Sequence, residues 1–167
     1  MEILIEKSSI QIKERIESWF LRYFNKNKAD FNGSEIFTLF DFLDLELQGK
    51  LIKHLSLLTN EIPVLGLKIS DTEYIINTTH RFIKLQNTHK EILDYAEFEC
   101  HLGYKNIVIN KDEEITIKRD GYLEEFGLKK KNGEIIYWKI PTGSAGFGFW
   151  NITNKCELIG RKFIITG

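Results

Sequence analysis

The chain has 167 residues, of which 43% are hydrophobic and 13% aromatic, and it carries 23 basic and 24 acidic side chains. This length and composition are typical of one folded domain with a sizeable core, and they exclude a disordered chain. The formal charge of −1 argues against the strongly basic surface of proteins that bind nucleic acid or anionic membranes. We expect one domain over residues 1–167, with a helical part over 1–60 and a β-rich part over 61–167.

The N-terminal segment and the cysteines indicate where the protein resides. Residues 1–6 are too few and too acidic for a signal peptide, and the chain has no uncharged apolar run of roughly 18 residues. Cys100 and Cys156 lie far apart, and a chain of this size folds without a disulfide, so we expect reduced thiols. The sequence therefore predicts a cytoplasmic protein without a transmembrane segment.

Residues 8–28 have apolar side chains at intervals of three and four, which predicts an amphipathic helix. A second helix is predicted from a cap at Ser34 to Leu58, where the same spacing continues, and Gly49 is a point at which it can divide. Residues 43–47 also alternate with period two, so a strand within 41–48 is the alternative. The longer window fits the helical period better and favours the helix.

After Pro63 the pattern changes to short β-branched and aromatic runs separated by polar turn residues. We predict strands at 64–69, 74–78, 82–85, 107–110, 115–118, 122–127 and 135–140. Their short, even spacing indicates an α+β fold in which the N-terminal helices pack on an antiparallel, barrel-like or strongly curved sheet. At the C-terminus two alternatives remain: a helix capped by Thr153 that carries Cys156 and Ile159, or a strand over 162–165.

The residue types that carry chemistry are dispersed. The four histidines fall on different predicted elements, and Cys100-His101 is their only close pairing with a cysteine, so the sequence predicts no metal site and no cofactor. The chain has no Gly-x-Ser-x-Gly pattern, and we expect Cys100 to be an inert thiol. The carboxylates grouped at Asp41/Asp44, 112–114 and Glu124/Glu125 are expected on solvated faces. No catalytic residue is predicted, although an enzyme whose residues are gathered only by folding stays open.

The longest basic run, Lys129–Lys131, precedes Asn132-Gly133, which is typical of a solvated hairpin tip, with phosphate binding as the alternative. Residues 141–150 hold three glycines and three aromatics but no P-loop pattern. One interpretation is a flexible loop that enters a strand. The other is a binding lip, with Phe147, Phe149 and Trp150 contacting a partner while Gly146 and Gly148 permit adjustment.

Residues 71–85 place an apolar strand before the Thr-x-x-Arg turn that runs from Thr78 to Arg81. An aromatic-acidic pair within 93–98 and predicted strands near 106–110 and 114–118 follow. Over residues 63–167 this pattern resembles bacterial pleckstrin-homology-like and GRAM-like domains. The resemblance implies a binding or scaffolding role without catalytic residues. The family closes its barrel with a C-terminal helix, whereas this chain ends in the apolar residues 163–165.

The functional prediction is a non-catalytic domain that covers or scaffolds a partner protein. A toxin-neutralising immunity protein is one such class, and the near-neutral charge argues against a basic nuclease as its target. The first alternative is a pleckstrin-homology-like adaptor for a peptide or lipid head group, which requires a basic mouth with residues such as Arg119, Lys129 and Lys130. The second is an enzyme without a recognisable motif.

Overall fold

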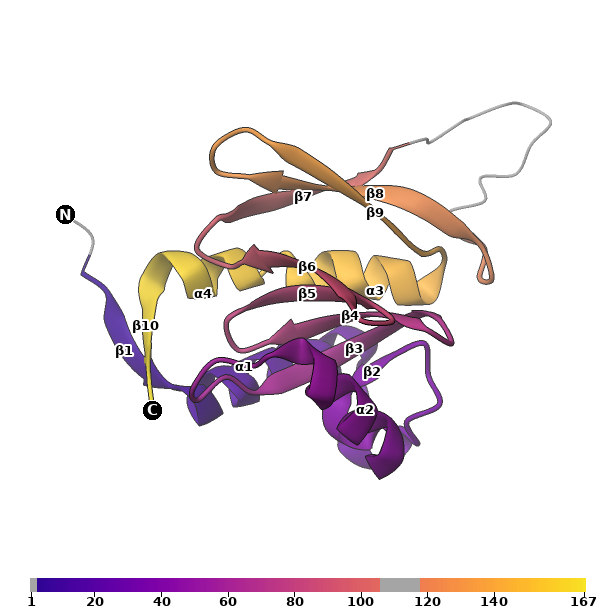
Figure 1. The fold of residues 1–167 in the computed structure, drawn as a ribbon, viewed down its shortest axis with the longest axis horizontal. Coiled ribbons are helices and arrows are strands. Elements are labelled where there is room, and N and C mark those ends of the chain that lie inside the picture. Colours follow the sequence, from indigo (N-terminus) through magenta and orange to yellow (C-terminus); the bar gives the residue numbers. More distant parts are fainter. Residues whose placement is uncertain (1–2, 106–117) are drawn as a thin grey trace.

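A computed structural model describes residues 3–105 and 118–167 (Figure 1). Its α-helices are α1 (Ser9–Phe24), α2 (Leu45–Leu55), α3 (Ser144–Thr153) and α4 (Cys156–Lys162). Its strands are β1 (Ile5–Ser8), β2 (Phe37–Leu39), β3 (Pro63–Ser70), β4 (Glu73–Thr78), β5 (Arg81–Gln86), β6 (His89–Asp94), β7 (Phe98–Tyr104), β8 (Leu123–Lys130), β9 (Ile135–Pro141) and β10 (Phe163–Thr166). The predicted α+β class with antiparallel sheets is confirmed.

The strands of the described residues form three separate sheets. One has the order β2-β3-β4-β5-β6 and another the order β7-β8-β9, both antiparallel, while β1 and β10 form a parallel pair. These sheets do not close into a barrel, so the predicted barrel-like curvature is not confirmed. Strands that follow one another along the chain are neighbours in both larger sheets. Short turns join β3 through β6 and β8 to β9, as predicted, whereas α2 lies between β2 and β3.

The elements stack in layers. Figure 1 shows α3 and α4 between the three-stranded sheet and the five-stranded sheet. Helix α1 contacts α3 and β3, whereas α2 contacts β5. One apolar cluster joins α1, α3, α4 and the facing sides of both large sheets, and a second lies between α2 and the opposite side of the five-stranded sheet. The five-stranded sheet is therefore covered on both faces.

Helix α1 confirms the first predicted helix, although it ends at Phe24 and not at Lys28. Ser8 caps it by accepting a hydrogen bond from the Gln11 backbone N–H, and the Gln11 side chain accepts one from the Ser8 N–H. Asn25 ends the helix in the left-handed conformation. Ile12, Ile16 and Phe20 of the predicted apolar stripe are fully buried, whereas Tyr23 near its end is 43% exposed.

The second predicted helix is wrong in its first half. Residues 37–39 form β2, which pairs with β3, and a 3₁₀ turn follows at 40–42. Ser34 caps no helix, because its hydroxyl donates to the Asn32 side chain within a turn. Helix α2 starts after Asp44, whose carboxylate accepts a hydrogen bond from the Leu47 N–H at 2.9 Å. Residues 45–48 are thus helical, and α2 runs through Gly49 undivided.

The predicted strands at 64–69, 74–78, 82–85, 122–127 and 135–140 are confirmed as β3, β4, β5, β8 and β9. Those at 107–110 and 115–118 lie outside the described residues, apart from Lys118. Strands β6 and β7 were missed, and β6 is an exposed edge strand with little apolar alternation. At the C-terminus the helix and the strand are each confirmed in part, because helix α4 is followed by strand β10. Thr153 is the last residue of α3 and caps neither α3 nor α4.

Candidate interaction surface

The glycine-rich run is a helix, so the predicted loop and strand are wrong. Helix α3 begins after Gly143, which has a φ of +75°, and the Asp120 carboxylate accepts a hydrogen bond from the Ser144 N–H at 3.0 Å. A Cβ at Gly146 would collide with the Tyr104 hydroxyl and the Pro141 carbonyl. Glycine is therefore required because α3 packs directly against β7 and β9, which the sequence alone did not reveal.

The five residues of the predicted lip all lie on α3, which faces the core. Phe149 is completely buried, and its ring meets those of Phe37, Phe82 and Phe126. Phe147 and Trp150 are half-buried beneath the three-stranded sheet, with their rings stacked at 6.3 Å. Gly146 and Gly148 are buried. Phe149 therefore offers no surface to a partner, and binding by the other four stays a prediction.

His101 is a buried titratable side chain of β7. Its Nε2 is 2.7 Å from Thr153 Oγ1, which donates its own proton to the Phe149 carbonyl, so Nε2 carries the hydrogen and Nδ1 is left without a partner among the described residues. Burial among aromatic rings lowers the pKa of His101 to about 3. The imidazole is neutral and structural at physiological pH.

The Thr-x-x-Arg turn builds a buried ion pair. Arg81 contacts both carboxylate oxygens of Glu61, at 2.9 and 3.1 Å, and donates to the Ser56 carbonyl. Thr78 donates to the same carboxylate and accepts from the Arg81 N–H. Burial raises the pKa of Glu61, but the hydrogen bonds from Arg81 and Thr78 outweigh it and hold that pKa below its usual value. This cluster fixes the loop that joins α2 to β3.

Several other predicted groups serve the fold. Lys129 and Lys130 are paired with Glu99 and Glu134, each at 3.3 Å, beside the confirmed hairpin turn at Gly133. The backbone carbonyl of Arg119 accepts a hydrogen bond from Thr142.

The predicted carboxylate groups also have structural partners. Asp41 binds Lys13, Asp44 caps α2 and Glu125 pairs with Lys105, whereas residues 112–114 lie outside the described chain. Within the described ranges, no three His, Cys, Asp or Glu side chains are grouped so that they could hold a metal ion.

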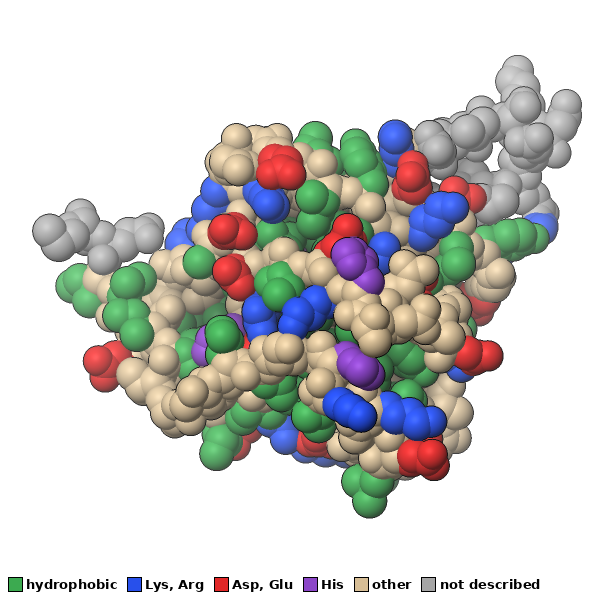
Figure 2. All heavy atoms as spheres, viewed as in Figure 1, with side chains coloured by type: hydrophobic (Ala, Val, Ile, Leu, Met, Phe, Trp, Pro, Cys, Tyr) green, Lys and Arg blue, Asp and Glu red, His purple; other side chains and the backbone are tan. Residues whose placement is uncertain are grey.

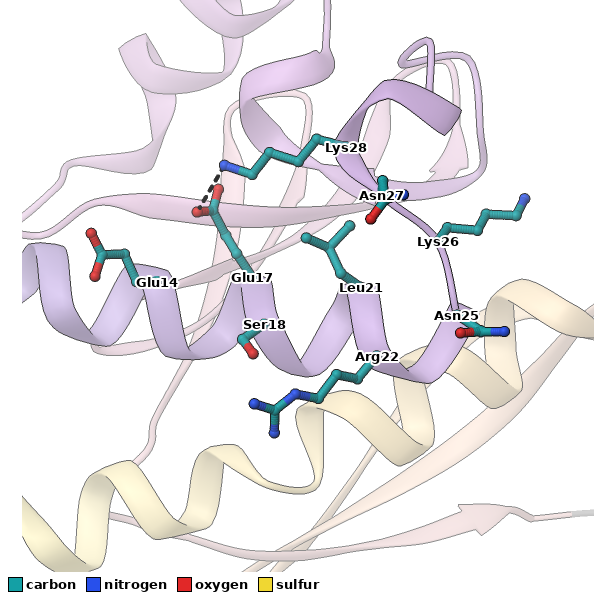
Figure 3. Close-up of a pocket in the computed structure, with 9 residues that line it drawn as sticks. All are labelled: Glu14, Glu17, Ser18, Leu21, Arg22, Asn25, Lys26, Asn27 and Lys28. Carbon is teal, nitrogen blue, oxygen red and sulfur yellow. Dashed lines mark ion pairs between the residues drawn. The ribbon is translucent and has the colours of Figure 1, made fainter.

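A polar hollow of about 540 Å³ lies beside the C-terminal half of α1 (Figure 3). Its walls are Glu14, Glu17, Ser18, Leu21 and Arg22 on the helix and residues 25–28 after it. The Glu17 side chain is nine-tenths buried, and the Lys28 ammonium contacts its carboxylate at 3.5 Å. The hollow, named here the α1 hollow, therefore presents a carboxylate within its wall.

The solvent-facing side of the three-stranded sheet carries large apolar side chains. Gly127 pairs with Tyr137, Lys129 with Ile135 and Leu123 with Pro141, so these positions share the face opposite to buried Phe126 and Trp138. Leu102 reaches the same side at a bulge of β7. We define the outer face by its four large apolar side chains, which are 41–46% exposed: Leu102, Leu123, Ile135 and Tyr137.

Gly127 lets two of these side chains meet in the centre of the outer face. A Cβ there would lie 3.2 Å from the Tyr137 ring and 3.3 Å from the Leu102 Cβ. The ring and Leu102 thus cover the Gly127 backbone from opposite sides and form one apolar stripe over three strands. The Lys105 ammonium lies 4.6 Å from the centre of the Tyr137 ring.

Charged pairs border this stripe. Lys105 contacts Glu125 at 3.5 Å, and Lys129 contacts Glu99 at 3.3 Å. An apolar centre with a rim of both charge signs is the usual anatomy of a protein–protein interface. These residues were not among the predicted site residues, although a signal was present: two outward positions of β9, Ile135 and Tyr137, are large and apolar, while Lys139 is polar as on a solvated strand.

Comparisons with models of known protein families, with characterised proteins and with solved structures gave no match. Over the described ranges, every helix is too short or too polar to cross a membrane.

Proposed function

We propose that this protein is a binding domain that attaches to a partner protein through its outer face. The observation that carries the proposal is the outer face. Leu102 and Tyr137 meet there over Gly127, Ile135 is the next outward residue of β9, and Leu123 lies beyond the pair of Glu125 and Lys139. Exposed apolar patches with polar rims mark interaction sites on soluble proteins. Aromatic side chains such as Tyr137 are enriched among the residues that dominate binding energy.

The rim indicates the chemistry of the partner. Lys105 with Glu125, and Lys129 with Glu99, largely neutralise each other. Figure 2 shows acidic and basic side chains interspersed over the visible face of the molecule, in keeping with the net charge of −1. The partner surface should therefore be apolar in its centre with both charge signs around it, and not strongly basic or acidic.

The alternative functions have less support. A head-group-binding adaptor requires free basic side chains, whereas Lys129 and Lys130 are paired. Catalysis requires an acid–base or nucleophilic pair in a cleft. The deeply buried His101 and Cys156 are poor candidates, because burial lowers the pKa of the first to about 3 and raises that of the second to about 12.

The test is affinity capture from the lysate of the native organism with three baits. The first is the wild type, the second is Leu102→Ser/Tyr137→Ser in the outer face, and the third is Leu45→Ser/Ile52→Ser, a matched loss of exposed apolar side chains on α2. Circular dichroism confirms that each bait is folded. We expect one stoichiometric protein on the wild type and the α2 variant but not on the outer-face variant. Equal capture by all three baits, or capture by none, would contradict the proposal.

A further inference from the structure

We propose that a hollow beside β10 binds a carboxamide that carries an apolar side chain, either in a free small molecule or in a polypeptide. The hollow holds about 310 Å³ and lies where α4 and β10 meet the turns that join β4 to β5 and β6 to β7. We name it the β10 hollow. Its polar wall has His80 and Asp94, and its large apolar side chains are these five: Leu58, Tyr95, Ile159, Phe163 and Ile165. An apolar space with a few polar groups is the usual anatomy of a small-ligand site.

The imidazole of His80 is oriented by a chain of hydrogen bonds. The Ile62 N–H donates to Thr79 Oγ1 at 3.1 Å, and this hydroxyl lies 2.6 Å from His80 Nδ1. Nδ1 is the acceptor that the described chain offers to the Thr79 hydroxyl hydrogen, so the neutral ring carries its own hydrogen on Nε2. Burial lowers the pKa of His80, which keeps the ring neutral near pH 7. Because Nδ1 is occupied, the Nε2–H is the donor that His80 presents to the β10 hollow.

The two polar groups lie together and are unused within the described chain. The Tyr95 N–H donates to the His80 carbonyl at 3.0 Å, which places His80 beside the end of β6, where Asp94 is the last residue. His80 Nε2 and the Asp94 carboxylate have no hydrogen-bond or ion-pair partner among the described residues. In the α1 hollow, by contrast, Glu17 is paired with Lys28. One amide satisfies both groups, because its carbonyl accepts from the Nε2–H while its N–H donates to the carboxylate.

The charges around the β10 hollow select against other apolar ligands. Asp94 repels a ligand carboxylate. The nearby arginines are engaged, because Arg81 is held by Glu61 at 2.9 and 3.1 Å and the Arg15 guanidinium lies over the Phe163 ring at 4.9 Å. An ammonium ligand would suit Asp94 but would leave the Nε2–H of His80 without an acceptor. A neutral amide with an apolar side chain is the class that meets all of these conditions.

The probes are N-acetylleucine amide and two analogues, each titrated into ¹⁵N-labelled protein and followed by NMR. N-acetylglycine amide lacks the apolar side chain, and N-acetylleucine carries a carboxylate in place of the terminal amide. We expect saturable shifts at the lining residues of the β10 hollow with N-acetylleucine amide, and about ten-fold weaker binding of each analogue. A short leucine-containing peptide with blocked ends is titrated in parallel. Binding of the peptide at least as tight as that of the amide assigns the site to a polypeptide, and weaker binding assigns it to a free small molecule.

Substitutions at the two polar groups give the sharpest test. His80→Leu removes the Nε2–H and should weaken binding of N-acetylleucine amide about five-fold, the scale of one lost hydrogen bond. His80→Gln keeps an N–H donor and should retain most of the affinity. Asp94→Asn should bring the affinity of N-acetylleucine close to that of the amide, because the repulsion is gone. His89→Leu, which removes an exposed histidine of β6, is the matched control and should change nothing.

The lining residues of the β10 hollow are separate from the four residues of the outer face, so this proposal and the proposed function are tested independently. It is overturned if the three probes bind the wild type equally or not at all. It is also overturned if a folded His80→Leu variant binds N-acetylleucine amide as tightly as the wild type does, or if the shifts lie outside the β10 hollow.

Discussion

The two large sheets differ in how many of their faces are covered. The five-stranded sheet packs against α3 on one side and α2 on the other, and all of β4 except Glu73 is buried. The three-stranded sheet is covered on one side, and along β9 buried Trp138 and Ile140 alternate with exposed Tyr137 and Lys139. A sheet with one free face should be polar there. The large apolar side chains that share this free face with Glu125, Lys129 and Lys139 depart from that pattern, and they are the basis of the proposed binding role.

The largest contrast is expected between the two sides of the three-stranded sheet. Phe149→Ala should cost about 3–5 kcal/mol of unfolding free energy, because it leaves a cavity among aromatic rings. Tyr137→Ala, on the outer face, should cost about 1 kcal/mol or less. Urea unfolding measures both. Similar losses for the two variants would show that the outer face also belongs to the stability of the fold.

The ion pairs of the two sheets should differ in the same sense. Arg81→Met leaves the Glu61 carboxylate buried without its partner, at a cost of about 3–5 kcal/mol. Lys129→Met breaks an exposed pair with Glu99 and should change the unfolding free energy by about 1 kcal/mol or less. Equilibrium denaturation compares them, and a small loss for Arg81→Met would contradict the structural role given to the Thr-x-x-Arg turn.

Acid should reveal the burial of His101. Its pKa is about 3 in the folded protein against about 6.5 in an unfolded chain. Between these values the unfolded state binds the proton and the folded state does not. Stability should fall as the pH drops from 6.5 towards 3, by about 1.4 kcal/mol per pH unit from this group. The unfolding free energy of the His101→Gln variant should depend less on pH over this window than that of the wild type. An equal slope for the two proteins would argue against a buried neutral imidazole.

The smallest contrast concerns two glycines. Gly146→Ala pushes a methyl group into the Tyr104 hydroxyl and the Pro141 carbonyl, and overpacking of this kind costs about 1–3 kcal/mol. Gly127→Ala places a methyl group 3.2 Å from the Tyr137 ring, which can turn towards solvent, and 3.3 Å from the Leu102 Cβ, which moves only with its backbone. We expect a cost of about 1 kcal/mol or less, below that of Gly146→Ala. Thermal unfolding of both variants tests the difference, and the reverse order would contradict the packing of α3.

The parts of the fold that were predicted are those where one periodicity dominates. The stripe of α1 and the β-branched runs of β3, β4 and β5 determine their own structure, because burial on a fixed face selects helix or strand. Residues 36–43 fit a helical spacing equally well, yet pairing with β3 makes 37–39 a strand. That choice is made by tertiary contacts, which spacing within one segment does not contain.

The candidate site was predicted less well, and the glycines explain why. In 141–150 three glycines suggested a loop, whereas Gly146 and Gly148 are needed because α3 lies close to its neighbours. The aromatic residues of that run accordingly pack inside. Conversely, Tyr137 lay in a predicted strand and Leu102 in a strand that was missed, and only the register of β7, β8 and β9 shows that they meet on a free face.

The central claim, that the outer face binds a partner protein, is tested most directly by isothermal titration of the captured partner against the three purified baits. We predict that the Leu45→Ser/Ile52→Ser control binds as tightly as the wild type, within about two-fold. The Leu102→Ser/Tyr137→Ser variant should bind at least about ten-fold more weakly, as expected for the loss of a central aromatic contact. Equal affinity of all three proteins would contradict the claim.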